Sequence, residues 1–228
     1  MKLVLFDIDG TILTSQGVGR KAIASALHHV SGISVNSDGV SFAGRTDPQI
    51  MRDLLRVGGL SENEIENVFW ECMDSYVAIL MRTLIPEMIT ILPGIQGLIR
   101  ALSGRSDIAL GLLTGNLKDT AFLKLHAAGL GSYFSFGAYG SDREDRNELP
   151  HVAADRAALA FGSPLAVEKT VIVGDTPNDI ECAARYGARS VAVCTGVFSR
   201  SELAQCDADL LVDDFKDPEP MFELLDRL

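Results

Sequence analysis

The sequence has few cysteines, few basic residues and no long apolar run. Its 228 residues include 4 cysteines, none in a C-x-x-C pair, so a zinc site or redox pair has little support. The 20 basic residues are outnumbered by 31 acidic ones, and the formal net charge of −11 disfavours binding to nucleic acid or to an anionic membrane surface. No run approaches the roughly 18 apolar residues that a membrane span requires.

The amino terminus also lacks the pattern of a secretory leader. Only the short apolar run Leu3–Phe6 precedes the first aspartate, which is too short for the apolar region of a signal peptide. Together with the sparse thiols, this predicts a cytoplasmic protein with reduced cysteines. The hydrophobic fraction of 47% beside 22% charged residues is typical of a folded globular chain. The length suits one α/β domain, or a core domain with a small insert.

Short apolar runs that end in Asp, Thr or Gly alternate with amphipathic helical segments. Runs without polar alternation are typical of strands buried on both faces of a parallel sheet. The alternation therefore predicts βαβ units and an α/β fold. The predicted strands are Leu3–Phe6, Ile108–Leu113, Thr170–Val173, Ser190–Cys194 and Asp209–Val212, and the predicted helices include Ile95–Leu102, Thr120–Ala128 and Pro150–Ala160.

One block, from about Val18 to about Thr83, has helical periodicity and no convincing strand. Its apolar residues between Ile65 and Leu80 recur at spacings of three and four, which places them on one stripe of a long helix. Ser61 followed by Glu64 is a capping-box pattern at the start of that helix.

A shorter helix is predicted to follow Thr46-Asp47-Pro48 and to end at Gly58-Gly59. We therefore expect an all-helical insert over residues 15–87, within a core built from residues 1–14 and 88–228. The connections near Thr14–Gly17 and Ile85–Leu92 are the expected hinges.

Two carboxylates follow the first predicted strand. Asp7 and Asp9 are two residues apart, so along a strand they point to the same side. They would repel each other unless a cation or a proton lies between them. Ligands bind at this carboxyl edge of open α/β sheets, and Mg²⁺ prefers such oxygen ligands. The alternative is an acidic turn with a purely structural role.

Polar residues also follow two further predicted strands. Thr114, Gly115 and Asn116 bring a hydroxyl and backbone N–H groups to a strand–helix junction, which suits a phosphoryl oxygen. Asp175 and Asp179 add a metal-binding carboxylate and a partner one helical turn on. Each turn is common by itself. Their recurrence at three strand ends indicates one site.

With these motifs the chain resembles the haloacid dehalogenase (HAD) superfamily, close to its phosphoglycolate phosphatase-like members. "DIDGT" from residue 7 matches the first motif, "LLTGN" from residue 112 the second and "VGDTPND" from residue 173 the fourth. The resemblance covers essentially the whole chain. It implies a doubly wound, mostly parallel Rossmann-like core, an inserted helical cap and a Mg²⁺-dependent phosphatase.

The resemblance also implies a role for each matching position. Asp7 is the expected nucleophile, which forms an aspartyl-phosphate, and Asp9 is the expected general acid and base. Mg²⁺ is expected to be held by the Asp7 carboxylate, the Asp9 backbone carbonyl and Asp175, with Asp179 as a supporting partner. The groups expected to bind the phosphoryl oxygens are those of Thr114, Gly10, Thr11, Gly115 and Asn116.

The sequence departs from the family at the third motif, where a Lys is usual at the start of a helix. No Lys occurs between Lys124 and Lys169, and Lys169 immediately precedes a predicted strand, on the wrong side of the sheet. Arg146 opens the helix that leads towards the fourth motif, so we expect it to replace that Lys and to hold the nucleophile. Arg143 is the alternative replacement, and a solvated surface position is the other possibility for Arg146.

Substrate choice is expected to lie with the helical insert. Arg45 stands just before the helix that follows Pro48, and in similar proteins a loop at this place faces the active site. Arg45 would then meet a substrate carboxylate or a second anionic group. In the alternative, Thr46 or Asp47 caps the helix and Arg45 lies on the surface.

These observations favour a Mg²⁺-dependent phosphatase of small phosphomonoesters, either phosphoglycolate-like compounds or sugar phosphates. A phosphomutase of the β-phosphoglucomutase kind shares the motifs and is an alternative. A non-catalytic binding domain is a third reading, but the loss of Asp7 or Asp9 that would mark it is not seen. The expected partner is a small phosphorylated molecule rather than nucleic acid or a membrane, and the oligomeric state is left open.

Overall fold

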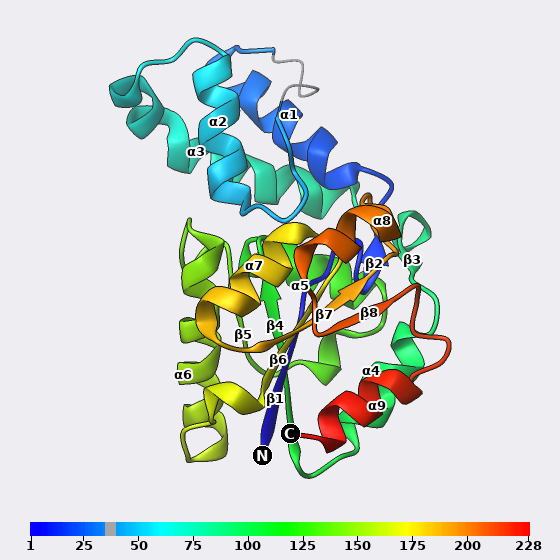
Figure 1. Cartoon of the computed structure of the whole chain (residues 1–228). Coiled ribbons are helices and arrows are strands. Elements are labelled where there is room, and N and C mark those ends of the chain that lie inside the picture. The colour runs from blue at the N-terminus through cyan, green and yellow to red at the C-terminus, as the bar shows by residue number, and fades with distance from the viewer. Residues whose placement is uncertain (35–39) are drawn as a thin grey trace.

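The computed structural model describes residues 1–34 and 40–228 of the chain, and residues 35–39 of the predicted helical block lie outside this description. Six parallel strands form the main sheet in the order β5-β4-β1-β6-β7-β8 (Figure 1). The first strand is thus central, and the chain builds outward from it on both sides. Ligands bind at such a switch point, beyond the carboxyl ends of the strands. The strands are β1 (Lys2–Phe6), β4 (Ile108–Thr114), β5 (Gly137–Tyr139), β6 (Thr170–Gly174), β7 (Arg189–Val193) and β8 (Leu210–Val212).

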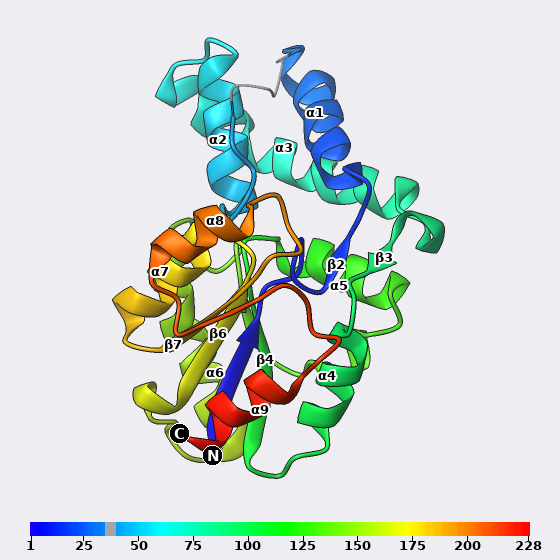
Figure 2. The ribbon, with the colours of Figure 1, turned by 45° about the vertical axis from the view of Figure 1, so that its right-hand side comes forward.

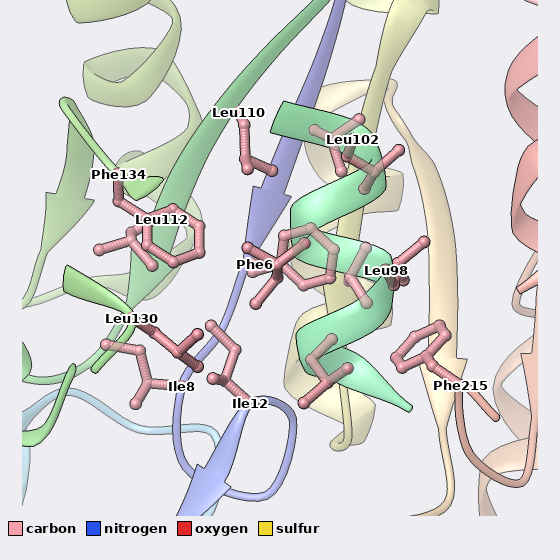
Figure 3. Close-up of a cluster of buried hydrophobic side chains, with 14 of the residues drawn as sticks. Phe6, Ile8, Ile12, Leu98, Leu102, Leu110, Leu112, Leu130, Phe134 and Phe215 are labelled. Carbon is pink, nitrogen blue, oxygen red and sulfur yellow. The ribbon is translucent and has the colours of Figure 1, made fainter. Parts of the chain in front are cut away.

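Helices cover both faces of this sheet. Alternate side chains of β1 point to opposite faces, so Phe6 packs with the cluster under α4 whereas Leu5 packs with the cluster under α6. Figure 3 shows Phe6 beside Leu98 of α4, with Phe215 on the far side of that helix. One face is covered by α4 (Ile95–Ser103), α5 (Lys118–Ala127) and α9 (Glu219–Asp226), and the other by α6 (Leu149–Phe161) and α7 (Pro177–Tyr186).

The five predicted strands and the parallel sheet are confirmed, with end points shifted by at most one residue. The predicted helices near residues 95, 120 and 150 are confirmed as well. The sequence analysis did not predict β5 or the short helix α8 (Arg200–Leu203). Strand β5 begins with Gly137 and α8 has only four residues, so neither carries an apolar run or a periodic pattern that would mark it.

Three helices lie over the carboxyl edge of the sheet, as both ribbon views show (Figures 1 and 2). Their inward residues form a hydrophobic cluster separate from those of the sheet. We call this group the helical unit; it consists of α1 (Val18–Ser31), α2 (Asp47–Val57) and α3 (Glu62–Thr83). The capping box of Ser61 and Glu64 is confirmed, and the stripe from Ile65 to Leu80 is buried as predicted.

The two connections between the helical unit and the sheet run side by side. Strand β2 (Leu13–Thr14) pairs antiparallel with β3 (Thr90–Ile91), so the outgoing and returning segments are hydrogen-bonded to each other. This ribbon lies next to the predicted hinges. The boundaries between residues 14 and 15 and between 87 and 88 stay a prediction. In the described part of the chain, none of the helices has the length and apolarity needed to cross a membrane.

Candidate active site

A cavity of about 900 Å³ lies between the carboxyl edge of the sheet and the helical unit. Side chains from both parts line it, including Arg20 and Tyr76 from the helical unit. Thr11 and Asp179, which the sequence analysis also assigned to the site, are buried and do not line the cavity. The remaining predicted site residues all line it: Asp7, Asp9, Gly10, Arg45, Thr114, Gly115, Asn116, Arg146 and Asp175.

Three buried carboxylates cluster at the carboxyl edge of the sheet, and two of them, Asp7 and Asp175, line the cavity. One oxygen each of Asp7, Asp175 and Asp179 lies within 4.8 Å of the others. Burial, with smaller contributions from Asp179 and Asp9, raises the pKa of Asp7 to about 6 against the lowering effect of Arg146. Burial likewise raises the pKa of Asp175 well above its usual range. A hard divalent cation relieves such a charge concentration, so this set of oxygen donors fits one.

Arg146 supplies the positive charge beside these carboxylates. Its side chain is 6% exposed, and its Nη2 donates to Asp179 Oδ1 and lies 3.4 Å from Asp7 Oδ1. Burial lowers the pKa of Arg146, but Asp179 and Asp7 outweigh it and keep the guanidinium charged. Arg143 is exposed and pairs with Glu148 at 3.2 Å. The structure therefore places Arg146, not Arg143, at the nucleophile candidate.

The turn after β6 fixes Asp179 towards Arg146. Thr176 caps helix α7, and its N–H and hydroxyl both donate to Asp179 Oδ2, at 3.1 and 2.6 Å. The other carboxylate oxygen is left to accept from Arg146. A Cβ at Gly174 would lie 2.0 Å from Asp179 Cγ, so this approach requires glycine at position 174. Asp179 thus orients Arg146 from behind the cavity.

Asp175 is oriented by the turn after β1. Thr11 Oγ1 donates to Asp175 Oδ1 at 3.1 Å, so the Thr11 hydroxyl is directed to this carboxylate rather than into the cavity. Gly10 has a φ of 87°, and a Cβ there would lie 2.3 Å from Asp175 Oδ2. A Cβ at Gly196 would lie 1.7 Å from the same oxygen. The two glycines therefore leave the space that Asp175 Oδ2 occupies.

Asp9 is held by two groups from the segment after β4. Asn116 Nδ2 donates to Asp9 Oδ2 at 2.8 Å and to Thr114 Oγ1 at 2.9 Å. Lys124 of helix α5 donates to the same Asp9 oxygen at 2.5 Å and to Asn116 Oδ1 at 2.6 Å. The side chain of Asn116, predicted as a substrate contact, is thus engaged by protein groups.

The sequence analysis did not identify Lys124 as a site residue. Its side chain is 5% exposed, and it lies on the buried side of α5 with Ala121 and Leu125. The signal that was present is its position: a lysine on the apolar face of a helix needs a buried partner. That partner, Asp9, is 115 residues away in the sequence.

The loop before α2 joins the helical unit to the turn after β4. The Asp47 N–H donates to Gly115 O at 2.8 Å, and a Cβ at Gly115 would lie 2.0 Å from Arg45 O. Thr46 caps α2 through its hydroxyl, as one alternative predicted. Arg45 lines the cavity but pairs with Asp53 at 2.5 Å.

Asp47 is a buried acceptor at this junction rather than a simple helix cap. Its Oδ2 accepts from the Leu117 N–H at 3.0 Å and from the hydroxyls of Tyr76 at 3.2 Å and Thr120 at 3.4 Å. Burial raises its pKa to about 6, against the lowering effect of Lys124. One carboxylate therefore links α2 and α3 of the helical unit to the start of α5.

Comparison with known proteins gives consistent matches. The model of the haloacid dehalogenase-like hydrolase family matches residues 4–193. A phosphoglycolate phosphatase of Pseudomonas fluorescens (strain Pf0-1) is 25% identical over 224 residues, which cover 94% of this chain and 77% of that protein.

Solved structures share the fold over nearly the whole chain. A β-phosphoglucomutase from Clostridium difficile has a TM-score of 0.73 at 20% identity, covering 100% of this chain and 98% of that one. CbbY from Rhodobacter sphaeroides, solved in complex with phosphate, has a TM-score of 0.72 at 23% identity, covering 95% and 96%.

Proposed function

We propose that the chain, which belongs to the haloacid dehalogenase-like hydrolase family, is a Mg²⁺-dependent phosphatase of small phosphomonoesters. The family and its phosphoglycolate phosphatase relatives support a hydrolase of phosphoric monoesters. The observation that carries the proposal is the position of Asp7, which lies beside Arg146 and within 4.8 Å of Asp175 at the floor of the cavity. A carboxylate so placed suits nucleophilic attack on a phosphoryl group.

The metal ion would be held by the carboxylates of Asp7 and Asp175 and by the backbone carbonyl of Asp9. All of these are oxygen donors, the kind that Mg²⁺ prefers. When bound, Mg²⁺ would neutralise charge between the incoming phosphoryl group and the carboxylates. Thr11 and Asp179 contribute indirectly, because Thr11 orients Asp175 and Asp179 orients Arg146.

The reaction would proceed in two steps at Asp7. In the first, an Asp7 oxygen attacks phosphorus, the ester P–O bond breaks, and Asp9 gives its proton to the departing oxygen. In the second, water attacks phosphorus and gives a proton to Asp9. The P–O bond to Asp7 breaks, which releases phosphate and restores the Asp7 carboxylate. Asp9 lines the cavity with its side chain 41% exposed, which leaves it accessible to both partners.

The phosphoryl oxygens would be bound by groups around Asp7. Thr114 and Gly115 line the cavity there, and Arg146 adds a fixed positive charge. Gly10 lines the cavity too, but its N–H donates to Leu13 O at 2.9 Å and is not free for the substrate. Substrates would be phosphoglycolate-like compounds or sugar phosphates, for which the cavity of about 900 Å³ has room. Arg45 would reach a second anionic group only by exchanging its contact with Asp53.

Phosphate release from a panel of phosphomonoesters, measured with Mg²⁺ and with EDTA, tests this function. The panel contains phosphoglycolate, sugar phosphates, nucleotides and pyrophosphate. We expect metal-dependent release from one or a few small esters. Isomerisation of a sugar phosphate without net release would support the phosphomutase alternative. If a folded protein supplied with Mg²⁺ catalyses neither reaction, that result contradicts the proposal and favours a non-catalytic domain.

A further inference from the structure

Lys124 is a buried cation that the two-step reaction above leaves without a role. Its Nζ lies 2.5 Å from Asp9 Oδ2 and 2.6 Å from Asn116 Oδ1. Because Asn116 also donates to Asp9 Oδ2, the three side chains form a closed triangle of hydrogen bonds. Burying an ammonium group is costly unless it is paired, and Asp9 and Asn116 supply the partners here.

The triangle holds one oxygen of Asp9 and leaves the other without a protein donor. Both donors, from Lys124 and Asn116, converge on Oδ2. Among residues 1–34 and 40–228, no side chain or backbone group donates to Oδ1. The carboxylate is therefore fixed at one end, and its free oxygen belongs to a side chain that lines the cavity.

Lys124 lies at the wall of the cavity, and its surroundings leave only 5% of its side chain exposed. Gly19 of α1 lies directly over it, since a Cβ at position 19 would be 3.8 Å from Lys124 Nζ and 3.8 Å from the Tyr76 hydroxyl. Asp47 supplies a second negative charge that acts on Lys124 from the helical unit. Hydrogen bonds between charged groups are stronger when shielded from water.

We propose that Lys124 is a positioning residue that fixes the carboxylate of Asp9 in the orientation needed for proton transfer to the leaving oxygen and from the attacking water. The proposal rests on the proposed phosphatase function. Lys124 also sets the side-chain amide of Asn116, because its ammonium can only donate and thus requires the amide oxygen to face it. Without Lys124, Asp9 would keep one hydrogen bond and lose its fixed orientation.

The dependence of the rate on the leaving group of the substrate distinguishes a loss of Asp9 positioning from general damage to the site. An alkyl phosphate needs a proton from Asp9 in the first step, whereas p-nitrophenyl phosphate releases a stable anion without one. Lys124→Met should lower kcat for the alkyl ester on the order of 10- to 100-fold. With p-nitrophenyl phosphate the first step should persist and the second should slow. The variant should therefore give a burst of nitrophenolate, about one per enzyme molecule, before slow turnover.

Lys118→Met is the matched control, because Lys118 is an exposed lysine on the same helix. It should behave as the parent protein does with both esters. Equal losses of the burst and of steady turnover in a folded Lys124→Met protein would overturn the proposal. So would unchanged turnover of the alkyl ester.

A double-mutant cycle tests whether Lys124 acts through Asp9. The residual rate of Asp9→Asn should not fall further when Lys124→Met is added, because the positioned group is already absent. Additive losses would contradict the proposal. Should Lys124→Met fail to fold, Lys124→Gln, which retains a donor to Asp9, is tested by the same burst assay. Failure of the phosphatase function itself is distinguishable, because the parent protein would then release no phosphate.

Discussion

Asp7 has little contact with water, and a guanidinium group lies beside it instead. Asp7 is 6% exposed, and Arg146 Nη2 lies 3.4 Å from Asp7 Oδ1. Arg146 in turn serves two carboxylates, because Asp179 accepts from the same nitrogen. The sequence predicted both aspartates from their motifs. Arg146 could be proposed only because a lysine was missing where the family usually has one.

Removing Arg146 should affect both stability and turnover. Arg146→Ala leaves Asp7 and Asp179 buried without their cation, so the free energy of unfolding should fall by about 3–5 kcal/mol. Its kcat should fall by at least about 10²-fold, as expected when a fixed charge is lost from a phosphoryl site. Arg146→Lys should retain part of the stability and part of the turnover. Arg143→Ala is the control, since Arg143 is exposed. Near-parental kinetics in Arg146→Ala would contradict this assignment.

The raised pKa of Asp7 predicts how stability depends on pH in the metal-free protein. Burial lifts this pKa from an ordinary 3.8 to about 6, so folding takes up a proton between these values. The corresponding stabilisation is fully present below pH 3.8 and is lost as the pH rises through about 6. It amounts to about 3 kcal/mol at most.

Asp7→Asn should remove this dependence. In urea unfolding with EDTA, the advantage of the variant over the parent protein should grow as the pH rises from about 4 to about 7. Asp47 titrates in the same range and is present in both proteins, so the difference between them reports on Asp7 together with Asp175, whose pKa Asp7 raises. An advantage that shrinks with rising pH would show that Arg146 outweighs burial at Asp7.

At the scale of elements, the strands that lead into the site were predictable because they are buried on both faces. β1, β4 and β6 are continuous apolar runs, and each is followed by a polar turn that reaches the cavity. β5 has three residues, begins with Gly137 and lies at the edge of the sheet, so it carries no such pattern. The carboxyl-edge site could be predicted because motif and strand end coincide.

Contacts between elements could not be predicted in the same way. The sequence pattern offered Asp47 as a helix cap, but its carboxylate accepts from the Leu117 N–H, 70 residues further along the chain. Lys124 was not identified as a site residue for the same reason, because its partner Asp9 is 115 residues away in the sequence. The identity of such partners depends on how α2, α3 and α5 are placed in space, which periodicity does not encode.

Asp47 should stabilise the junction between the helical unit and α5. Asp47→Ala leaves the buried Leu117 N–H without its acceptor, so the free energy of unfolding should fall by about 1–3 kcal/mol. Asp47→Asn keeps an acceptor oxygen and should lose less. Asp74→Ala, at an exposed position of α3, is the control. Equal losses for the Ala and Asn variants would show that the charge of Asp47, rather than its acceptor oxygen, matters.

At the scale of the whole molecule, the site is assembled from both ends of the chain and covered by the helical unit. Asp7 and Asp175 come from strands that are neighbours in the sheet, whereas Gly19, Asp47 and Tyr76 come from the helices above it. The cavity therefore lies between the two layers. The ribbon of β2 and β3 connects the sheet to the helical unit, so a hinge motion between these two layers would bend the chain there.

Metal binding should stabilise the whole fold. A cation that binds the native carboxylates and not the unfolded chain adds about 2.7 kcal/mol at 100 times its Kd. Mg²⁺ should thus raise Tm, and EDTA should reverse the rise. Asp175→Asn should abolish the Mg²⁺-dependent increment, whereas Asp226→Asn, an exposed carboxylate on α9, should retain it. A full increment in Asp175→Asn would place the ion elsewhere.

The most direct test of the account is to find the phosphoryl group on Asp7. The Asp9→Asn variant, which lacks the base for the second step, is mixed with Mg²⁺ and acetyl phosphate, quenched in acid and digested for mass spectrometry. We predict one phosphorylated peptide, carrying the group on Asp7, and none when Asp7→Asn is combined with it. A phosphoryl group on another residue, or steady phosphate release with Asp7 replaced, would contradict the central claim.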